Sequence, residues 1–304
     1  MRIFVTGASG FIGSNVSGAL ARAGHEVLGL VRTPAKAQAL AAQGIEPIVG
    51  DMALPVAWRA RAAECEVRIH CAAEYSERYR TLDRATAAEL LGQPAARGST
   101  PLVIYTSGVW IYGDTGGKIV DEHTALSPSA FVLPRTEVEA LVLGADGPGL
   151  HTLVLRPGCV YGGHGSLTAG WFETAAQEQA AHFVGTGAQR WAMVHVSDLA
   201  RLYLQAVESG LHGEVFNAVD ASTASVRECA EAASRAAGAD GKTLSVPLED
   251  ARKLYGPMAD CLCYDQLVNS DKAAAMLGWK PKQRTFVEQA ETLFRSWQAS
   301  TASE

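Results

Sequence analysis

The sequence has no run of about 20 apolar residues and no excess of basic side chains. Without such a run, no segment is expected to cross a membrane as a helix. The formal net charge of -6 leaves no broad basic surface to neutralise the phosphates of a nucleic acid. We therefore expect neither a membrane nor a nucleic acid as a partner.

Metal-binding cysteine patterns and a leader segment are also lacking. The six cysteines have no C-x-x-C spacing, and Cys261 and Cys263 are too few for a metal site without further ligands. We expect reduced thiols and no metal. The apolar residues 3–5 run directly into a glycine-rich turn, which is not typical of a signal peptide. A cytoplasmic location is therefore expected.

Short apolar runs alternate with helical patterns over the first half of the chain. We expect strands at residues 2–6, 26–31, 47–49, 67–71, 102–106 and 150–155, and helices at residues 11–23, 35–42, 57–63, 83–91 and 135–143. Such alternation calls for a parallel sheet with helices on both faces. It predicts an α/β fold with a doubly wound parallel sheet of the Rossmann type.

The strict alternation stops after residue 158. Helices are expected at 171–181, 226–237 and 286–297, while segments 191–207 and 214–219 are expected to add material back to the sheet. We predict a dinucleotide-binding domain of residues 1–161 plus about 190–220. A smaller, discontinuous C-terminal α+β substrate lobe would comprise residues 162–189 plus 221–304.

A glycine-rich turn, Thr6-Gly7-Ala8-Ser9-Gly10-Phe11-Ile12-Gly13, joins the first expected strand to the first expected helix. The glycines permit a tight turn, a close approach of the backbone to a pyrophosphate, and packing of the helix on the strand. The helix N-terminus adds a partial positive charge. We predict that this turn binds a dinucleotide through Gly7, Ser9, Gly10, Phe11, Ile12 and Gly13; the alternative is an ordinary strand-to-helix turn.

Arg32 follows the second expected strand, where an NAD enzyme would place an acidic residue against the ribose. A guanidinium cannot accept a hydrogen bond from the ribose 2′-hydroxyl, but it can bind a 2′-phosphate. Lys36 lies one helical turn further on. These residues favour NADP over NAD, although Arg32 could also be a solvated strand end.

Several segments resemble the extended short-chain dehydrogenase/reductase family, in its epimerase/dehydratase branch. They are Gly50-Asp51-Met52, Ile69-His70-Cys71-Ala72-Ala73, Thr106-Ser107-Gly108-Val109-Trp110-Ile111-Tyr112-Gly113, Leu155-Arg156-Pro157-Gly158-Cys159-Val160-Tyr161-Gly162, Met193-Val194-His195-Val196-Ser197-Asp198-Leu199-Ala200 and Leu277-Gly278-Trp279-Lys280-Pro281. The resemblance implies that Asp51 and Met52 contact adenine and that Ala72 and Ala73 lie beside the nicotinamide ribose. It also implies that Pro157 lies on a loop crossing the nicotinamide.

The catalytic residues of that family are replaced in this chain. The family uses a serine or threonine, a tyrosine, and a lysine four residues after the tyrosine; here the corresponding positions hold Gly108, Phe131 and Arg135. Arg135 keeps a positive charge that could hold the ribose hydroxyls, but it stays protonated and cannot relay a proton. It could also be a surface residue. The pattern is similar to atypical members that vary or lose the chemistry.

Several other side chains could supply a proton. We favour Tyr161, with Arg135 as the nearby cation that a tyrosine needs near neutral pH and with the hydroxyls of Thr106 and Ser107 nearby. Further candidates are Tyr112, Tyr75, Glu74, His123 and His164. Each could equally line a wall or bond to backbone, and His195 is expected to be structural.

Aromatic residues are expected either to line a substrate cleft or to fill a core: Trp110, Trp171, Phe172 and Trp191, together with Met193. The sequence predicts an NADP-dependent oxidoreductase acting on a small, partly apolar, carbonyl-containing metabolite. The alternative is a dinucleotide-binding protein without net redox chemistry, such as an isomerase, a cyclase, a dehydratase or a regulator that senses NADP(H). A homodimer stays open.

Overall fold

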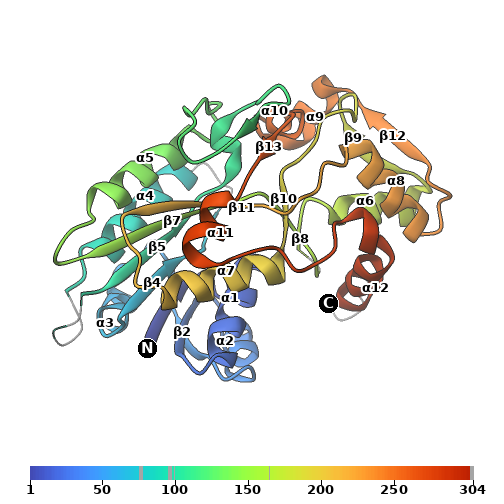
Figure 1. Ribbon diagram of the computed structural model, residues 1–304. Coiled ribbons are helices and arrows are strands. Elements are labelled where there is room, and N and C mark those ends of the chain that lie inside the picture. Colours follow the sequence, from blue (N-terminus) through green and yellow to red (C-terminus); the bar gives the residue numbers. More distant parts are fainter. Residues whose placement is uncertain (75–77, 95–97, 99, 164, 302–304) are drawn as a thin grey trace. The chain divides into compact units, whose positions relative to one another are not determined.

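The computed structural model describes residues 1–74, 78–94, 98, 100–163 and 165–301 (Figure 1). The chain divides into two compact units, each made of three stretches. The first unit comprises Met1–Ser107, Pro134–Arg156 and Ala200–Phe216, and the second comprises Gly108–Leu133, Pro157–Leu199 and Asn217–Glu304. The assignment of one part of the chain to the cofactor and another to the substrate stays a prediction, because compactness does not show what each unit binds.

A seven-stranded sheet forms the centre of the first unit, with the order β11-β7-β5-β4-β1-β2-β3. Its strands are β1 (Arg2–Thr6), β2 (Glu26–Val31), β3 (Glu46–Val49), β4 (Val67–His70), β5 (Leu102–Thr106), β7 (His151–Pro157) and β11 (Glu214–Ala218). The pairs from β7 to β3 are parallel. Strands such as β5 are buried along their whole length, which explains their continuous apolar runs.

Helices cover both faces of this sheet. They are α1 (Phe11–Arg22), α2 (Pro34–Ala41), α3 (Arg59–Ala63), α4 (Tyr79–Leu91) and α5 (Leu133–Gly144), with a short 3-10 turn at Pro55–Ala57. Figure 1 shows α1 and α2 on one face and α4 and α5 on the other. The core between α4, α5 and the sheet includes Tyr105, Val138 and Val154. The predicted doubly wound Rossmann fold is confirmed.

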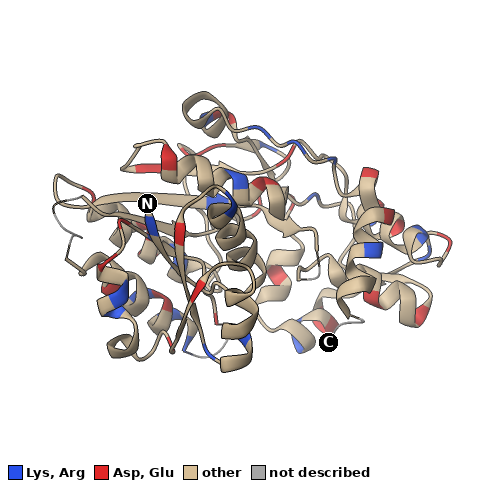
Figure 2. Ribbon diagram, turned by 90° about the horizontal axis from the view of Figure 1, so that it is seen from below, with Lys and Arg blue, Asp and Glu red and all other residues tan. Residues whose placement is uncertain are grey.

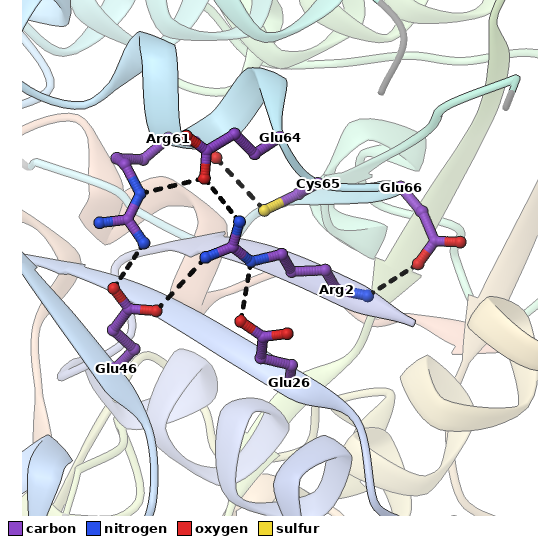
Figure 3. Close-up of polar contacts among 7 residues, drawn as sticks. All are labelled: Arg2, Glu26, Glu46, Arg61, Glu64, Cys65 and Glu66. Carbon is purple, nitrogen blue, oxygen red and sulfur yellow. Dashed lines mark hydrogen bonds and ion pairs between the residues drawn. The ribbon is translucent and has the colours of Figure 1, made fainter. Parts of the chain in front are cut away.

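Charged side chains tie the amino ends of the strands together (Figure 3). The guanidinium of Arg2 pairs with Glu26 at 2.8 Å and with Glu64 at 2.5 Å, and its backbone N–H donates to Glu66. Arg61 pairs with the same Glu64 carboxylate at 3.2 Å. These residues lie at the starts of β1 and β2 and before β4, so the network fixes the edge opposite the one where β1 meets the glycine-rich turn.

The second unit contains small parallel strand pairs instead of one large sheet. β8 (Cys159–Tyr161) pairs with β10 (Met193–His195), β9 (Ala181–Val184) with β12 (Thr243–Val246), and β6 (Ile119–Val120) with β13 (Leu267–Val268). Segment 214–219 joins the main sheet as expected, because it forms β11. Segment 191–207 does not, because its strand β10 pairs with β8 instead. The short β10 ends where α7 (Val196–Glu208) begins.

Helices and an aromatic core complete the second unit. The helices are α6 (Ala169–Glu178), α8 (Val226–Ala236), α9 (Leu248–Tyr255), α10 (Met258–Leu262), α11 (Asp271–Leu277) and α12 (Ala290–Thr301), with 3-10 turns at Val109–Tyr112 and Val287–Gln289. Trp171 stacks on Trp191 with ring centroids 5.3 Å apart, and Phe172 stacks on Phe286. Four of the proposed cleft residues are buried in this core: Trp171, Phe172, Trp191 and Met193. Trp110 is partly buried and packs against it. The core interpretation is therefore the better one.

Two properties concern the chain as a whole. Among the described residues, no helix combines the length and the apolar character needed to span a membrane. Acidic and basic positions are interspersed along the helices (Figure 2). The helices thus carry side chains of both signs, as expected for a chain with 26 basic and 32 acidic residues.

Candidate functional site

The carboxyl ends of β1, β2, β3 and β4 meet at one edge of the sheet, because these strands are parallel neighbours. The chain leaves β1 towards β2 and later returns on the other side of β1 as β4. In open α/β sheets, such a reversal of strand order marks the place where ligands bind. The glycine-rich turn, Arg32, Asp51 and Ala72 all follow these strand ends.

The glycine-rich turn is compact, and two of its glycines are required by its geometry. Gly7 has a φ of +68°, and a Cβ there would lie 2.7 Å from the Cα of Ala72. A Cβ at Gly13 would lie 2.1 Å from the carbonyl oxygen of Gly7. The turn therefore packs directly on the chain that leaves β4, which brings the predicted residues Gly7 and Ala72 together.

The N-terminus of α1 opens from this turn without a polar cap. Gly10 occupies the cap position with an extended backbone, no side chain caps the helix, and its first turn holds no acidic residue. The first amides of a helix have no partner within it and carry a partial positive charge. The amides of Phe11, Ile12 and Gly13 can thus receive an anion such as a pyrophosphate.

A buried network of polar side chains contacts the residues on both sides of the turn, and no motif in the sequence predicts it. The Thr6 hydroxyl accepts from the backbone N–H of Ala72 at 3.4 Å and lies 2.7 Å from Nδ1 of His70. Nε2 of His70 lies 3.1 Å from Asp83, which accepts a hydrogen bond from the Tyr105 hydroxyl at 2.7 Å. Burial would raise the pKa of Asp83, but His70, together with Arg135 and Tyr105, holds the pKa below its usual value.

Arg32 lies beyond the end of β2, as predicted, with most of its side chain in solvent. Its guanidinium lies 3.9 Å from the Glu74 carboxylate, which pairs more closely with Arg78 at 2.9 Å. Lys36 is exposed on α2, where its backbone N–H donates to the cap residue Thr33. An exposed cation at this position remains able to meet a phosphate.

Asp51 and Met52 form a turn after β3. The carbonyl of Asp51 accepts a hydrogen bond from the indole of the buried Trp58 at 3.0 Å, and its carboxylate accepts from the backbone of Ala53. Met52 packs partly buried against the core. After β4, Ala72 is half-buried and Ala73 is exposed. These contacts give the predicted adenine turn a fixed backbone.

Three predicted catalytic residues cluster at the end of β5 and the start of α5. Arg135 donates to the carbonyl of Thr106 at 2.9 Å, and its guanidinium carbon lies 5.5 Å from the centroid of the Tyr79 ring. The Thr106 hydroxyl lies 2.5 Å from the hydroxyl of Tyr203. The Ser107 hydroxyl is buried and finds no hydrogen-bond partner among the described residues. The bonding capacity of the Ser107 hydroxyl is therefore unused within the described part of the chain.

Tyr161, the favoured proton source, belongs to the second unit and is fully buried. Its hydroxyl lies 2.9 Å from the Asp220 carboxylate and 3.0 Å from the carbonyl oxygen of Arg284, two acceptors that share its single proton. Burial, and next the Asp220 charge, raise the pKa of Tyr161 far above its usual value. Burial also raises the pKa of Asp220 to about 6. These surroundings do not favour Tyr161 as a proton donor.

The remaining candidates have structural surroundings or lie elsewhere. The Tyr112 hydroxyl donates to Asn217 within the second unit, and Nδ1 of His195 accepts from the backbone of Ser197. His123 is exposed, and its backbone donates to Asp121. Tyr75 and His164 lie outside the described residues. Pro157, at the end of β7, is buried and belongs with Gly108 and Phe131 to the second unit.

Comparison with known proteins agrees with this architecture. Residues 3–218 match the NAD dependent epimerase/dehydratase family. An uncharacterized protein of Schizosaccharomyces pombe is 31% identical over 94% of this chain and 97% of that relative. A ketoreductase of Stigmatella aurantiaca, named for a 4-hydroxy-2-methyl-3-oxo-4-farnesyl-3,4-dihydroquinoline-1-oxide substrate, is 28% identical over 83% of this chain and 78% of its own.

A solved structure shows the same fold. The human epimerase family protein SDR39U1, crystallised with NADPH, superposes with a TM-score of 0.77 at 22% identity, over 97% of this chain and 99% of that one. The predicted resemblance is confirmed, and so is the prediction of an NAD(P)-dependent oxidoreductase or epimerase-like enzyme. Since the family match spans well over half of the sequence, the chain belongs to the NAD-dependent epimerase/dehydratase family.

Proposed function

We propose that this chain is an NADP-dependent oxidoreductase acting on a small, partly apolar metabolite that contains a carbonyl group. The observation that carries the proposal is the exposed Arg32 guanidinium beyond β2, on the same sheet edge as the uncapped N-terminus of α1. A pyrophosphate suits the helix end, and a 2′-phosphate suits the arginine. The ketoreductase relative and the NADPH-bound human protein support the same reading.

The chain's own residues would hold NADP(H) at separate points. The amides at the start of α1 bind the pyrophosphate, Arg32 binds the 2′-phosphate, and the turn at Asp51 and Met52 borders the adenine. Arg135, held by its bond to the carbonyl of Thr106, would bind the hydroxyls of the nicotinamide ribose, beside Ala73 in the proposal. When bound, the cofactor supplies or accepts the hydride.

The proton for the new alcohol then comes from solvent in this proposal, because Tyr161 is buried against Asp220. The buried Ser107 hydroxyl hydrogen-bonds the substrate carbonyl, a role that needs a donor without an internal partner. With hydride from a bound NADPH, the carbonyl oxygen held by Ser107 would take its proton from water, which would give the alcohol and NADP⁺. Residues 162–189 and 221–304 stay the predicted substrate lobe in this proposal.

A specific observation favours a second candidate function. By the resemblance to the family, Gly108 and Phe131 stand where its catalytic hydroxyl and tyrosine would be, and Phe131 lies before α5 begins. A protein with these replacements could bind the dinucleotide without net redox chemistry, as an isomerase, cyclase, dehydratase or NADP(H)-sensing regulator. Sustained cofactor turnover separates an oxidoreductase from all of these.

The test follows the absorbance of NADPH at 340 nm with a panel of small ketones, aldehydes and enones. We expect sustained consumption with at least one partly apolar carbonyl compound. Ser107→Ala should lower kcat about 10- to 100-fold with little change in cofactor affinity. As a matched control, Ser17→Ala removes another buried hydroxyl, on α1, and should leave kcat unchanged. Binding of NADPH without turnover across the panel would favour the second candidate.

A further inference from the structure

Glu74 and Arg78 lie beside Arg32 at the cofactor edge of the first unit. We propose that this pair determines how strongly the site discriminates NADPH from NADH: Glu74 opposes the 2′-phosphate, and Arg78 offsets Glu74. The inference rests on the proposed function, because it assigns specificity within the same dinucleotide site. The sequence pattern alone does not show that these three charged side chains lie together.

The three side chains form a line of alternating charge. Oε2 of Glu74 lies 3.9 Å from the Arg32 guanidinium, and Oε1 lies 2.9 Å from the guanidinium of Arg78. Glu74 is 21% exposed, whereas Arg32 and Arg78 are 66% and 63% exposed. The carboxylate is therefore the sheltered member, held between two arginines that reach into solvent.

The position of Glu74 gives it opposite effects on the two cofactors. A 2′-phosphate bound by Arg32 places about two negative charges near the Glu74 carboxylate, and like charges at such distances repel. The 2′-hydroxyl of NADH carries no charge and can donate a hydrogen bond to a carboxylate, which is the role of the acidic residue in NAD enzymes. Glu74 thus weakens NADPH binding and favours NADH.

Arg78 shifts this balance back towards NADPH. Its contact with Glu74, at 2.9 Å, is closer than that of Arg32 and occupies one carboxylate oxygen. Removing Arg78 removes the closer of the two arginine contacts of Glu74, so more of the carboxylate's charge acts on Arg32 and on a bound ribose. Loss of the arginine should therefore lower NADPH affinity and raise NADH affinity, although Arg32 itself is unchanged.

The experiment measures Kd for NADPH and NADH by fluorescence titration of the full chain and its variants at low ionic strength. Glu74→Gln should raise the ratio of Kd for NADH to Kd for NADPH about tenfold, and Arg78→Gln should lower it about fivefold. In the double variant Glu74→Gln/Arg78→Gln, the effect of losing Arg78 should largely vanish, because its partner is gone.

Glu137→Gln is the matched control, since it removes a partly exposed carboxylate that also pairs with an arginine of α4, Arg80. Its ratio should equal that of the parent protein. The inference is overturned if Glu74→Gln and Glu137→Gln give the same ratio, or if the Arg78 effect persists without Glu74. A parent protein that binds neither cofactor would overturn the proposed function as well, so the two failures are distinguishable.

Discussion

Two glycines of the turn after β1, Gly7 and Gly10, are needed for different reasons. Gly7 has a positive φ and lies against the backbone of Ala72, so the fold itself requires a glycine there. Gly10 has an extended backbone that any residue can adopt, and among the described residues a Cβ would meet the Gly7 carbonyl oxygen, at 3.2 Å. The missing side chain of Gly10 therefore leaves room for a ligand at the start of α1.

This difference predicts a separation between stability and binding. Gly7→Val should lower the free energy of unfolding by roughly 2–4 kcal/mol through strain and overlap. Gly10→Val should lower it by less than about 1 kcal/mol while weakening NADPH binding at least about 100-fold. Urea unfolding and cofactor titration measure the two effects. A Gly10→Val variant that binds NADPH as the parent does would show that the turn does not hold the pyrophosphate.

Asp220 should make stability depend on pH in a predictable direction. Burial raises its pKa from 3.8 to about 6, so the folded state binds this proton more readily than the unfolded chain. The contribution is fully present below pH 4 and is lost as the pH rises through 6. Relative to Asp220→Asn, the parent should gain on the order of 3 kcal/mol of unfolding free energy between pH 7 and pH 4.

Urea unfolding of both proteins across this range isolates the contribution, because other carboxylates titrate in parent and variant alike. Partners that include His70 and His212 lower the pKa values of Asp83 and Asp146 despite their burial. The stabilising effect of these two carboxylates is therefore lost at more acidic pH. An identical pH dependence in parent and Asp220→Asn would mean that Asp220 titrates normally.

At the scale of elements, Arg68 connects β4 to the ends of two helices. Its buried guanidinium donates to the carbonyls of Ala62 in α3, Leu90 in α4, and Gln93 and Pro94 after α4. A cation at a helix C-terminus satisfies carbonyls that have no partner within the helix. Burial lowers the pKa of Arg68, but four carbonyl acceptors favour its charged form.

Arg68→Met should therefore lower the free energy of unfolding by about 3 kcal/mol, because it leaves several buried carbonyls without donors. Arg68→Lys should recover only part of this loss, since an ammonium group cannot span the same set of acceptors. Denaturant unfolding measures both variants. Equal stability of Arg68→Met and the parent would show that water replaces the guanidinium without cost.

The sequence predicts some elements well and others poorly, for physical reasons. Central strands of the main sheet, such as β5, are buried and rich in apolar residues, and β1, β2 and β5 have the expected bounds. Strands such as β6 and β13 have two residues each, too few for a periodic pattern. The neighbours of Tyr161 could not be predicted either, because Asp220 and Arg284 are distant in sequence.

At the scale of the whole molecule, the chain is a member of the NAD-dependent epimerase/dehydratase family, and we predict that Gly108 and Phe131 replace the family's usual catalytic hydroxyl and tyrosine. The predicted cofactor residues from Gly7 to Ala73 follow the ends of neighbouring parallel strands, which is why strand order alone brings them to one edge. The proton source could not be predicted in the same way, since it depends on burial and contacts that have no sequence signature.

The central claim is that this edge binds NADP(H) through Arg32, and calorimetric titration of the purified protein with NADPH and NADH tests it most directly. We predict that NADPH binds at least about tenfold more tightly, a difference of about 1.4 kcal/mol, and that Arg32→Asp reverses the preference. Equal affinities of the parent protein for the two cofactors, or a preference that Arg32→Asp leaves unchanged, would contradict the account.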